Sequence, residues 1–143
     1  PVHFLFVLIA LAAFQGKPAS SPASQPAPRV VRMKVTAYCL CQKCCGKWAA
    51  DKVRKTSTGD DATIYDGVAA DPKLLPYRTR LNIPGVGVKE VDDTGGAMRQ
   101  SAKKNVTHID VRMPSHQEAL KFGVRWLDVT MLPSSHSAQG ERR

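Results

Sequence analysis

Three aspartates beside turn residues are the side chains of this sequence best suited to acid–base chemistry. Asp71 lies in Ala-Ala-Asp-Pro, Asp93 in Asp-Thr-Gly-Gly and Asp110 in His-Ile-Asp-Val. A carboxyl group can protonate a leaving oxygen and later accept a proton if burial or a neighbouring carboxylate raises its pKa. Aspartate also stabilises turns, which is the favoured interpretation of Asp71 taken alone. Residue type therefore leaves both roles open.

The adjacent acids Asp92 and Asp93 stand in a chain whose formal net charge is +9. Successive side chains of a strand point to opposite faces, so at most one of the two can belong to a given site. We expect Asp93 to face the site and Asp92 to point outward into solvent.

The same alternation places His108 and Asp110 together on the polar face of their strand, with Ile109 and Val111 on the other face. We expect His108 to be a solvated strand residue. A protonated histidine there would lower the pKa of Asp110 and oppose its use as an acid.

Short alternating runs separated by turn residues predict the elements that must position these acids. Six strands are expected, at residues 30–38, 67–70, 79–83, 86–93, 106–111 and 126–132. One short helix is expected after Pro114, where Ser115 and Glu118 form a capping box and Gly123 ends the helix. Only 6% of the residues are aromatic, and the pattern as a whole predicts an all-β barrel or sandwich.

The two ends of the chain differ in composition from this middle part. Residues 1–16 contain an apolar run typical of a secretory signal, and residues 17–29 form a Pro/Ala/Ser linker. Because the chain begins at Pro1 and not at Met, the true start is expected upstream, and an uncleaved N-terminal membrane anchor is the alternative to a cleaved signal. Residues 30–132 are the predicted domain, and residues 133–143 a disordered tail.

All four cysteines fall within seven residues, at Cys39, Cys41, Cys44 and Cys45. In an exported protein, such a cluster favours disulfides or a structural pin over free thiols. A tetrahedral zinc site is the alternative, although no second, distant ligand pair is evident. A nucleophilic cysteine is a weaker third hypothesis.

Lysine and arginine are scattered along the chain, without the blocks or interleaved aromatic residues of a nucleic-acid-binding protein. The positive charge fits attraction to an anionic cell envelope better than nucleic-acid binding.

Four segments in this order resemble the 3D domain, a family named for three aspartates and related to stationary-phase survival proteins and to the barrel of membrane-bound lytic transglycosylase A. They are residues 67–72 (GVAADP), 93–98 (DTGGAM), 108–111 (HIDV) and 119–132 (ALKFGVRWLDVTML). Residues 36–49 (TAYCLCQKCCGKWA), with TSTG at 56–59, resemble a subgroup that has a Cys-rich loop. The resemblance covers about residues 33 to 132.

The resemblance implies a six-stranded double-psi β-barrel that acts on the glycan strands of peptidoglycan. It implies that Asp110 is the acid and then the base, that Asp93 supplies electrostatics and hydrogen bonds, and that Asp71 supports the site. A lytic transglycosylase cleaves the bond between N-acetylmuramic acid and N-acetylglucosamine without water and leaves a 1,6-anhydro end. Expected substrate-binding residues are Thr36, Tyr38, Thr58, Thr94, Gly95 and Gly96.

We therefore expect an exported monomer in the cell envelope that needs no cofactor or metal. Two alternatives come from other classes of protein. One is a barrel that binds cell-wall glycan without cutting it, and the other is a Cys-dependent redox or metal module.

Overall fold

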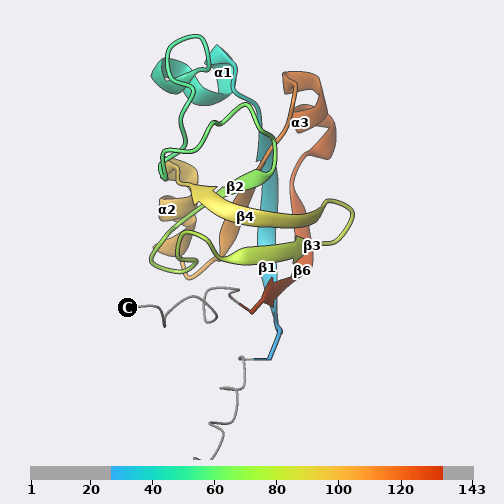
Figure 1. Ribbon diagram of the computed structural model, residues 1–143. Coiled ribbons are helices and arrows are strands. Elements are labelled where there is room, and N and C mark those ends of the chain that lie inside the picture. The colour runs from blue at the N-terminus through green and yellow to red at the C-terminus, as the bar shows by residue number, and fades with distance from the viewer. Residues whose placement is uncertain (1–26, 134–143) are drawn as a thin grey trace, which may run out of the picture.

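The computed structural model describes residues 27–133, which form a closed barrel of six strands (Figure 1). The order around the barrel is β1-β5-β2-β4-β3-β6. The strands are β1 (Arg29–Tyr38), β2 (Gly67–Ala70), β3 (Arg80–Ile83), β4 (Gly87–Asp93), β5 (His108–Arg112) and β6 (Arg125–Leu132). The predicted all-β, six-stranded barrel is confirmed, and each strand lies within two residues of its predicted bounds.

Two parallel pairs distinguish this barrel from a simple up-and-down one. β1 pairs in parallel with β5, and β2 with β4, whereas the other four neighbouring pairs are antiparallel. Parallel neighbours require crossover connections, so segments far apart in sequence meet at the same end of the barrel. This arrangement agrees with the double-psi topology that the family resemblance implies.

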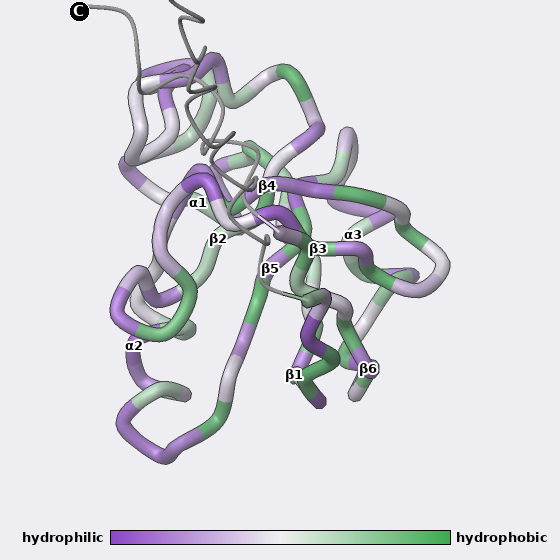
Figure 2. The backbone as a smooth tube through the Cα atoms, turned by 60° about the horizontal axis from the view of Figure 1, so that its bottom comes forward, coloured by the Kyte–Doolittle hydropathy of each residue, from purple (hydrophilic) through white to green (hydrophobic). Residues whose placement is uncertain are grey.

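The barrel interior is filled by aliphatic side chains. Apolar and polar residues follow one another along β5 (Figure 2). The core contains Met33, Val35, Val68, Ala70, Leu75, Leu81, Ile83, Val91, Ile109, Val111 and Val129. Ile109 and Val111 share this inner face, as the alternation of their strand predicts. Burial of this apolar surface is the main contribution to the stability of the fold.

The predicted helix is present as α3 (His116–Phe122). The Ser115 hydroxyl accepts a hydrogen bond from the Glu118 backbone at 3.2 Å, and Gly123 follows the helix with φ of 65°. The prediction of a single helix is wrong, because α1 (Gln42–Cys45), the 3-10 turn η1 (Gly46–Trp48) and α2 (Gly96–Ala102) are also present. These helices are short, and α2 has only one buried residue, so they lack the apolar periodicity that predicts a helix.

Several predictions concern parts of the chain outside the described residues. These parts are the signal-like segment, the linker up to residue 26, and the tail after residue 133. Among residues 27–133, no helix is both long enough and apolar enough to span a membrane.

Candidate functional site

A groove of about 630 Å³ contains two of the three predicted aspartates, Asp93 and Asp110. The barrel register brings them together, because Ala69 of β2 pairs with Asp110 on one side and with Asp93 on the other. The two aspartates are therefore two strands apart, roughly 10 Å between Cα atoms from the usual strand spacing. Ala69 also lines the groove, and its small side chain leaves room between them.

Asp110 is partly buried and has one side-chain hydrogen-bond partner within residues 27–133. The Thr36 hydroxyl, opposite it on β1, donates a hydrogen bond of 2.8 Å to Asp110 Oδ1. Burial raises the pKa of Asp110, and the Thr36 bond and the charge of Lys34 oppose that rise only in part. Of the two ways to raise the pKa of this carboxyl named above, burial and a neighbouring carboxylate, burial is the one that acts on Asp110.

His108 shares the face of Asp110, as predicted, but the prediction that it is solvated is wrong. Only 5% of the residue is exposed. Its Nε2 lies 2.8 Å from Thr36 Oγ1 and its Nδ1 lies 2.9 Å from Ser101 Oγ. Burial lowers the pKa of His108, with a further contribution from Lys34. A neutral His108 that donates to Thr36 satisfies these bonds and does not oppose a protonated Asp110.

Asp93 is held as a hydrogen-bond acceptor. Its Oδ1 accepts from the backbone and hydroxyl of Ser57, at 3.1 and 2.6 Å, and from the backbone of Thr94 at 2.8 Å. Its Oδ2 accepts from the Tyr38 hydroxyl at 3.2 Å. These four donors hold the Asp93 carboxylate in one orientation at the wall of the groove.

Asp92 is not the solvated residue that we expected, since it is 4% exposed and pairs with Arg112. A β-bulge explains the difference: Val68 pairs with Val91 but Ala69 pairs with Asp93, so Asp92 is the extra residue of β4. The bulge turns Asp92 inward against Gly67, where an added Cβ would overlap the carboxylate.

The buried pair connects Asp92 to the groove. Both terminal nitrogens of Arg112 donate to the Asp92 carboxylate, and one also donates to the Tyr38 hydroxyl at 3.0 Å. Burial raises the pKa of Asp92, and the guanidinium opposes that rise. An arginine remains charged inside a protein and can only donate hydrogen bonds. The Tyr38 hydroxyl therefore accepts from Arg112 and donates its own proton to Asp93.

Asp71 lies outside the groove, in the turn after β2. Its Oδ1 accepts a hydrogen bond of 2.9 Å from the Lys73 backbone, and its carbonyl accepts from Leu74 and Leu75. This is the turn role that the residue alone favours.

The predicted substrate-binding residues divide into two groups. Tyr38, Thr94, Gly95 and Gly96 line the groove, whereas Thr36 and Thr58 do not. The Thr36 hydroxyl donates a hydrogen bond to Asp110. The Thr58 hydroxyl donates to the carbonyl of Asp92 at 3.0 Å and to the carboxylate of Asp60 at 2.6 Å.

Sequence reasoning missed several polar and aromatic residues of the groove. Trp48, 61% exposed, lines it from η1, and Lys55, Ser57 and Arg99 add polar groups. An exposed tryptophan directly after a Cys-rich loop was a usable signal, because aromatic rings outside the core commonly serve binding. Lys55 lies in a loop and Arg99 in α2, and only the closed barrel brings these two segments to the same groove.

The expected disulfides are not formed, and all four cysteines are free. The thiols of Cys39, Cys41 and Cys44 instead lie within 3.9 Å of Nδ1 of His116. The Cys45 thiol donates a hydrogen bond to the carbonyl of Cys39 at 3.2 Å. The short α1 turn places the sulfurs of Cys41 and Cys44 close to one another and to His116 Nδ1 of α3.

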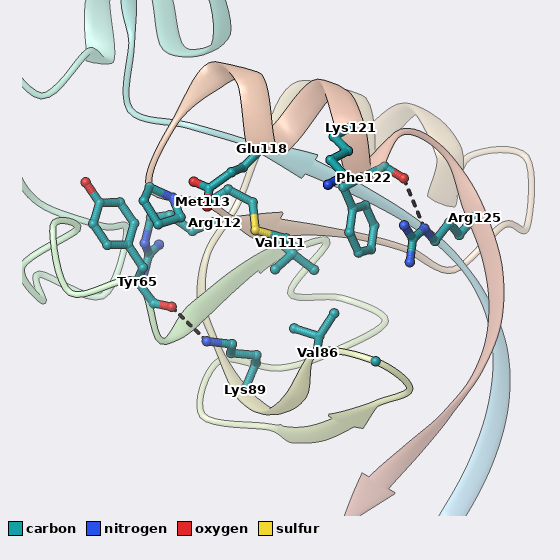
Figure 3. A pocket seen from close by; sticks show the side chains of 12 residues that line it. Tyr65, Val86, Lys89, Val111, Arg112, Met113, Glu118, Lys121, Phe122 and Arg125 are labelled. Atoms are coloured by element: carbon teal, nitrogen blue, oxygen red, sulfur yellow. Dashed lines mark hydrogen bonds between the residues drawn. The ribbon is translucent and has the colours of Figure 1, made fainter.

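A second hollow, of about 500 Å³, is bordered by the turn between β3 and β4 and by α3 (Figure 3). Its only carboxylate is that of Glu118, which accepts a hydrogen bond of 2.9 Å from the Ser115 hydroxyl in the helix cap. Lys89 at its edge donates to the Tyr65 carbonyl at 2.7 Å. None of the predicted site residues lines it, so the groove with Asp93 and Asp110 is the better candidate.

Comparison with known proteins shows similarity to a bacterial cell wall-binding protein. The sequence is 31% identical over 80 residues to the cell wall-binding protein YocH of Bacillus subtilis (strain 168). The match covers 54% of this chain but only 26% of YocH. No protein-family model matches the chain.

Proposed function

We propose that this protein is a lytic transglycosylase of the 3D type, with Asp110 as the acid and then the base. The observation that carries the proposal is the unequal state of the two groove carboxylates. Asp110 has one side-chain hydrogen bond and a pKa raised by burial, whereas Asp93 accepts four hydrogen bonds. A raised pKa suits a proton donor at neutral pH.

The proposed reaction uses one carboxyl twice. The Asp110 carboxyl gives its proton to the glycosidic oxygen as the bond to C1 of the muramic residue breaks. The resulting carboxylate then takes the proton from the muramic 6-hydroxyl as that oxygen bonds to C1. The products are a 1,6-anhydro end and a free 4-hydroxyl, no water is consumed, and Asp110 returns to its protonated form.

The state of Asp93 favours this route over ordinary glycoside hydrolysis. A retaining or inverting glycosidase needs a second carboxylate as nucleophile or as base for water. Three donors occupy Oδ1 of Asp93 and Tyr38 occupies Oδ2, which makes it a poor nucleophile. Its fixed charge can instead stabilise the positive charge that develops on the sugar ring.

The groove suits an acidic glycan substrate. Trp48 offers an exposed ring for stacking on a sugar, while Lys55 and Arg99 supply positive charge. Muramic residues carry a lactyl carboxylate or an attached peptide, so cations along the groove would favour them. The cell-wall name of the 31% identical relative supports peptidoglycan as the partner and the exported cell envelope as the location.

The experiment is digestion of purified peptidoglycan, with mass spectrometry of the released muropeptides. The unaltered protein should release 1,6-anhydromuropeptides, and Asp110→Asn should release none. Asp128→Asn is the matched control, because Asp128 is exposed on β6 and pairs only with exposed Arg32 among the described residues. Release by Asp110→Asn equal to that by the unaltered protein would refute the proposal.

A non-catalytic, glycan-binding barrel is the second candidate, favoured by the similarity to a cell wall-binding protein. Sedimentation with insoluble peptidoglycan separates the two functions. If the unaltered protein and Asp110→Asn both bind and neither releases anhydro products, the binding function is correct and the enzymatic one is not.

A further inference from the structure

Three cysteines and one histidine bring four ligand atoms to one point outside the carboxylate pair. The Sγ atoms of Cys39, Cys41 and Cys44 and a ring nitrogen of His116 all lie within 4.8 Å of one another. His116 Nδ1 lies 3.9, 3.7 and 3.3 Å from the sulfurs of Cys39, Cys41 and Cys44, respectively. The sulfurs of Cys39 and Cys44 are 3.7 Å apart.

These separations are those of a tetrahedral metal site. With zinc–sulfur bonds of about 2.3 Å and a zinc–nitrogen bond of about 2.0 Å, ideal tetrahedral angles place two sulfurs about 3.8 Å apart. The same geometry places sulfur and nitrogen about 3.5 Å apart. Each measured separation lies within about half an ångström of these values. Three thiolates and one imidazole are a ligand set that structural zinc sites use.

Two separate parts of the fold supply the ligands. Cys39 follows β1, Cys41 is the N-cap of α1, and Cys44 lies within α1. His116 is the first residue of α3. α1 and α3 lie at the same end of the barrel (Figure 1). The backbone amides of Cys44 and Cys45 both donate to the Cys41 carbonyl, at 3.1 and 2.9 Å, which fixes the turn that presents the thiols.

Cys45 is excluded from the set by its own hydrogen bond. Its thiol donates to the Cys39 carbonyl at 3.2 Å, and it is absent from the group of converging ligands. It therefore provides a control within the same loop.

We propose that Cys39, Cys41, Cys44 and His116 bind one zinc ion that ties the Cys-rich loop to α3. Four protein ligands leave no open position, so the ion is structural and not catalytic. Cys44, Cys45 and Trp48 line the groove, so the ion would fix the loop that forms one of its walls. The site stands independently of the transglycosylase proposal, and His116 supplies the distant ligand that the cysteine spacing lacks.

The test begins with the full chain purified without chelator or reducing agent. We expect one zinc ion per chain by elemental analysis. Alkylation of the folded protein, mapped by mass spectrometry, should spare Cys39, Cys41 and Cys44 until a chelator removes the zinc. Replacement of zinc by Co²⁺ should give the visible bands of a tetrahedral ion together with thiolate charge-transfer absorption, a readout that requires no variant.

The variants then test the ligand set by competition with a chromophoric zinc chelator. His116→Gln should bind zinc at least about ten times more weakly, whereas Cys45→Ser should keep the affinity of the unaltered protein. A disulfide among these cysteines in place of zinc would overturn the proposal. So would unchanged zinc affinity in His116→Gln. Neither result depends on glycan cleavage, so failure here is distinct from failure of the transglycosylase proposal.

Discussion

Replacing Asp92 with asparagine removes the carboxylate that neutralises Arg112 inside the barrel while keeping the size of the side chain. Arg112 is 1% exposed, and after the substitution the remaining carboxylate near it among the described residues is the exposed one of Asp66, 4.0 Å away. The charge of Arg112 is then only weakly compensated and cannot reach water. Breaking a buried ion pair from one side typically costs about 3–5 kcal/mol. For a domain of this size, that lowers the midpoint of thermal unfolding by roughly 12–20 °C or more.

Thermal and urea unfolding followed by circular dichroism measure this loss. Asp128→Asn, which removes one partner of an exposed ion pair with Arg32, should unfold like the unaltered protein. If the buried charge causes the loss, adding Arg112→Met to Asp92→Asn should recover part of the stability, because no unpaired charge remains. The reasoning is refuted if Asp92→Asn unfolds within about 1 kcal/mol of the unaltered protein.

Three further predictions concern the surroundings of the two acids. Because the proposed reaction begins with protonated Asp110, its rate should fall as pH rises through the raised pKa of that residue. Thr36→Val removes a hydrogen bond that lowers this pKa, so the falling limb of the pH–rate profile should move to higher pH. A move of that limb to lower pH would contradict the prediction. Trp48→Ala should weaken sedimentation with peptidoglycan several-fold and change stability by less than about 0.5 kcal/mol; unchanged binding would exclude stacking on this ring. Gly67→Ala places a Cβ against the Asp92 carboxylate and should destabilise the fold by about 1–3 kcal/mol in urea unfolding. Unaltered stability would contradict this prediction and show that the β-bulge can shift to make room for the added Cβ.

The six strands could be predicted because their signals are local. Alternation and turn residues are visible within each segment, and the capping box before α3 is equally local. Helix α2 was missed because it begins at Gly96 and buries only Met98. Such a helix forms through its place beside β5 and β2, and not through its own pattern.

The site was predictable only in part, because some of its features depend on pairing between distant segments. Asp93 and Asp110 share the groove as the resemblance implied. The inward turn of Asp92 follows from a bulge that exists only where β4 meets β2. Likewise, His116 is 72 residues from Cys44, and their proximity arises only when the barrel closes.

The central claim, that one carboxyl closes the muramic 6-hydroxyl onto C1, is tested most directly by digestion of peptidoglycan in ¹⁸O-labelled water. We predict anhydro products that carry no ¹⁸O from the unaltered protein, and no products from Asp110→Asn. Products with ¹⁸O at C1 of a reducing muramic end would show attack by water and would contradict the account.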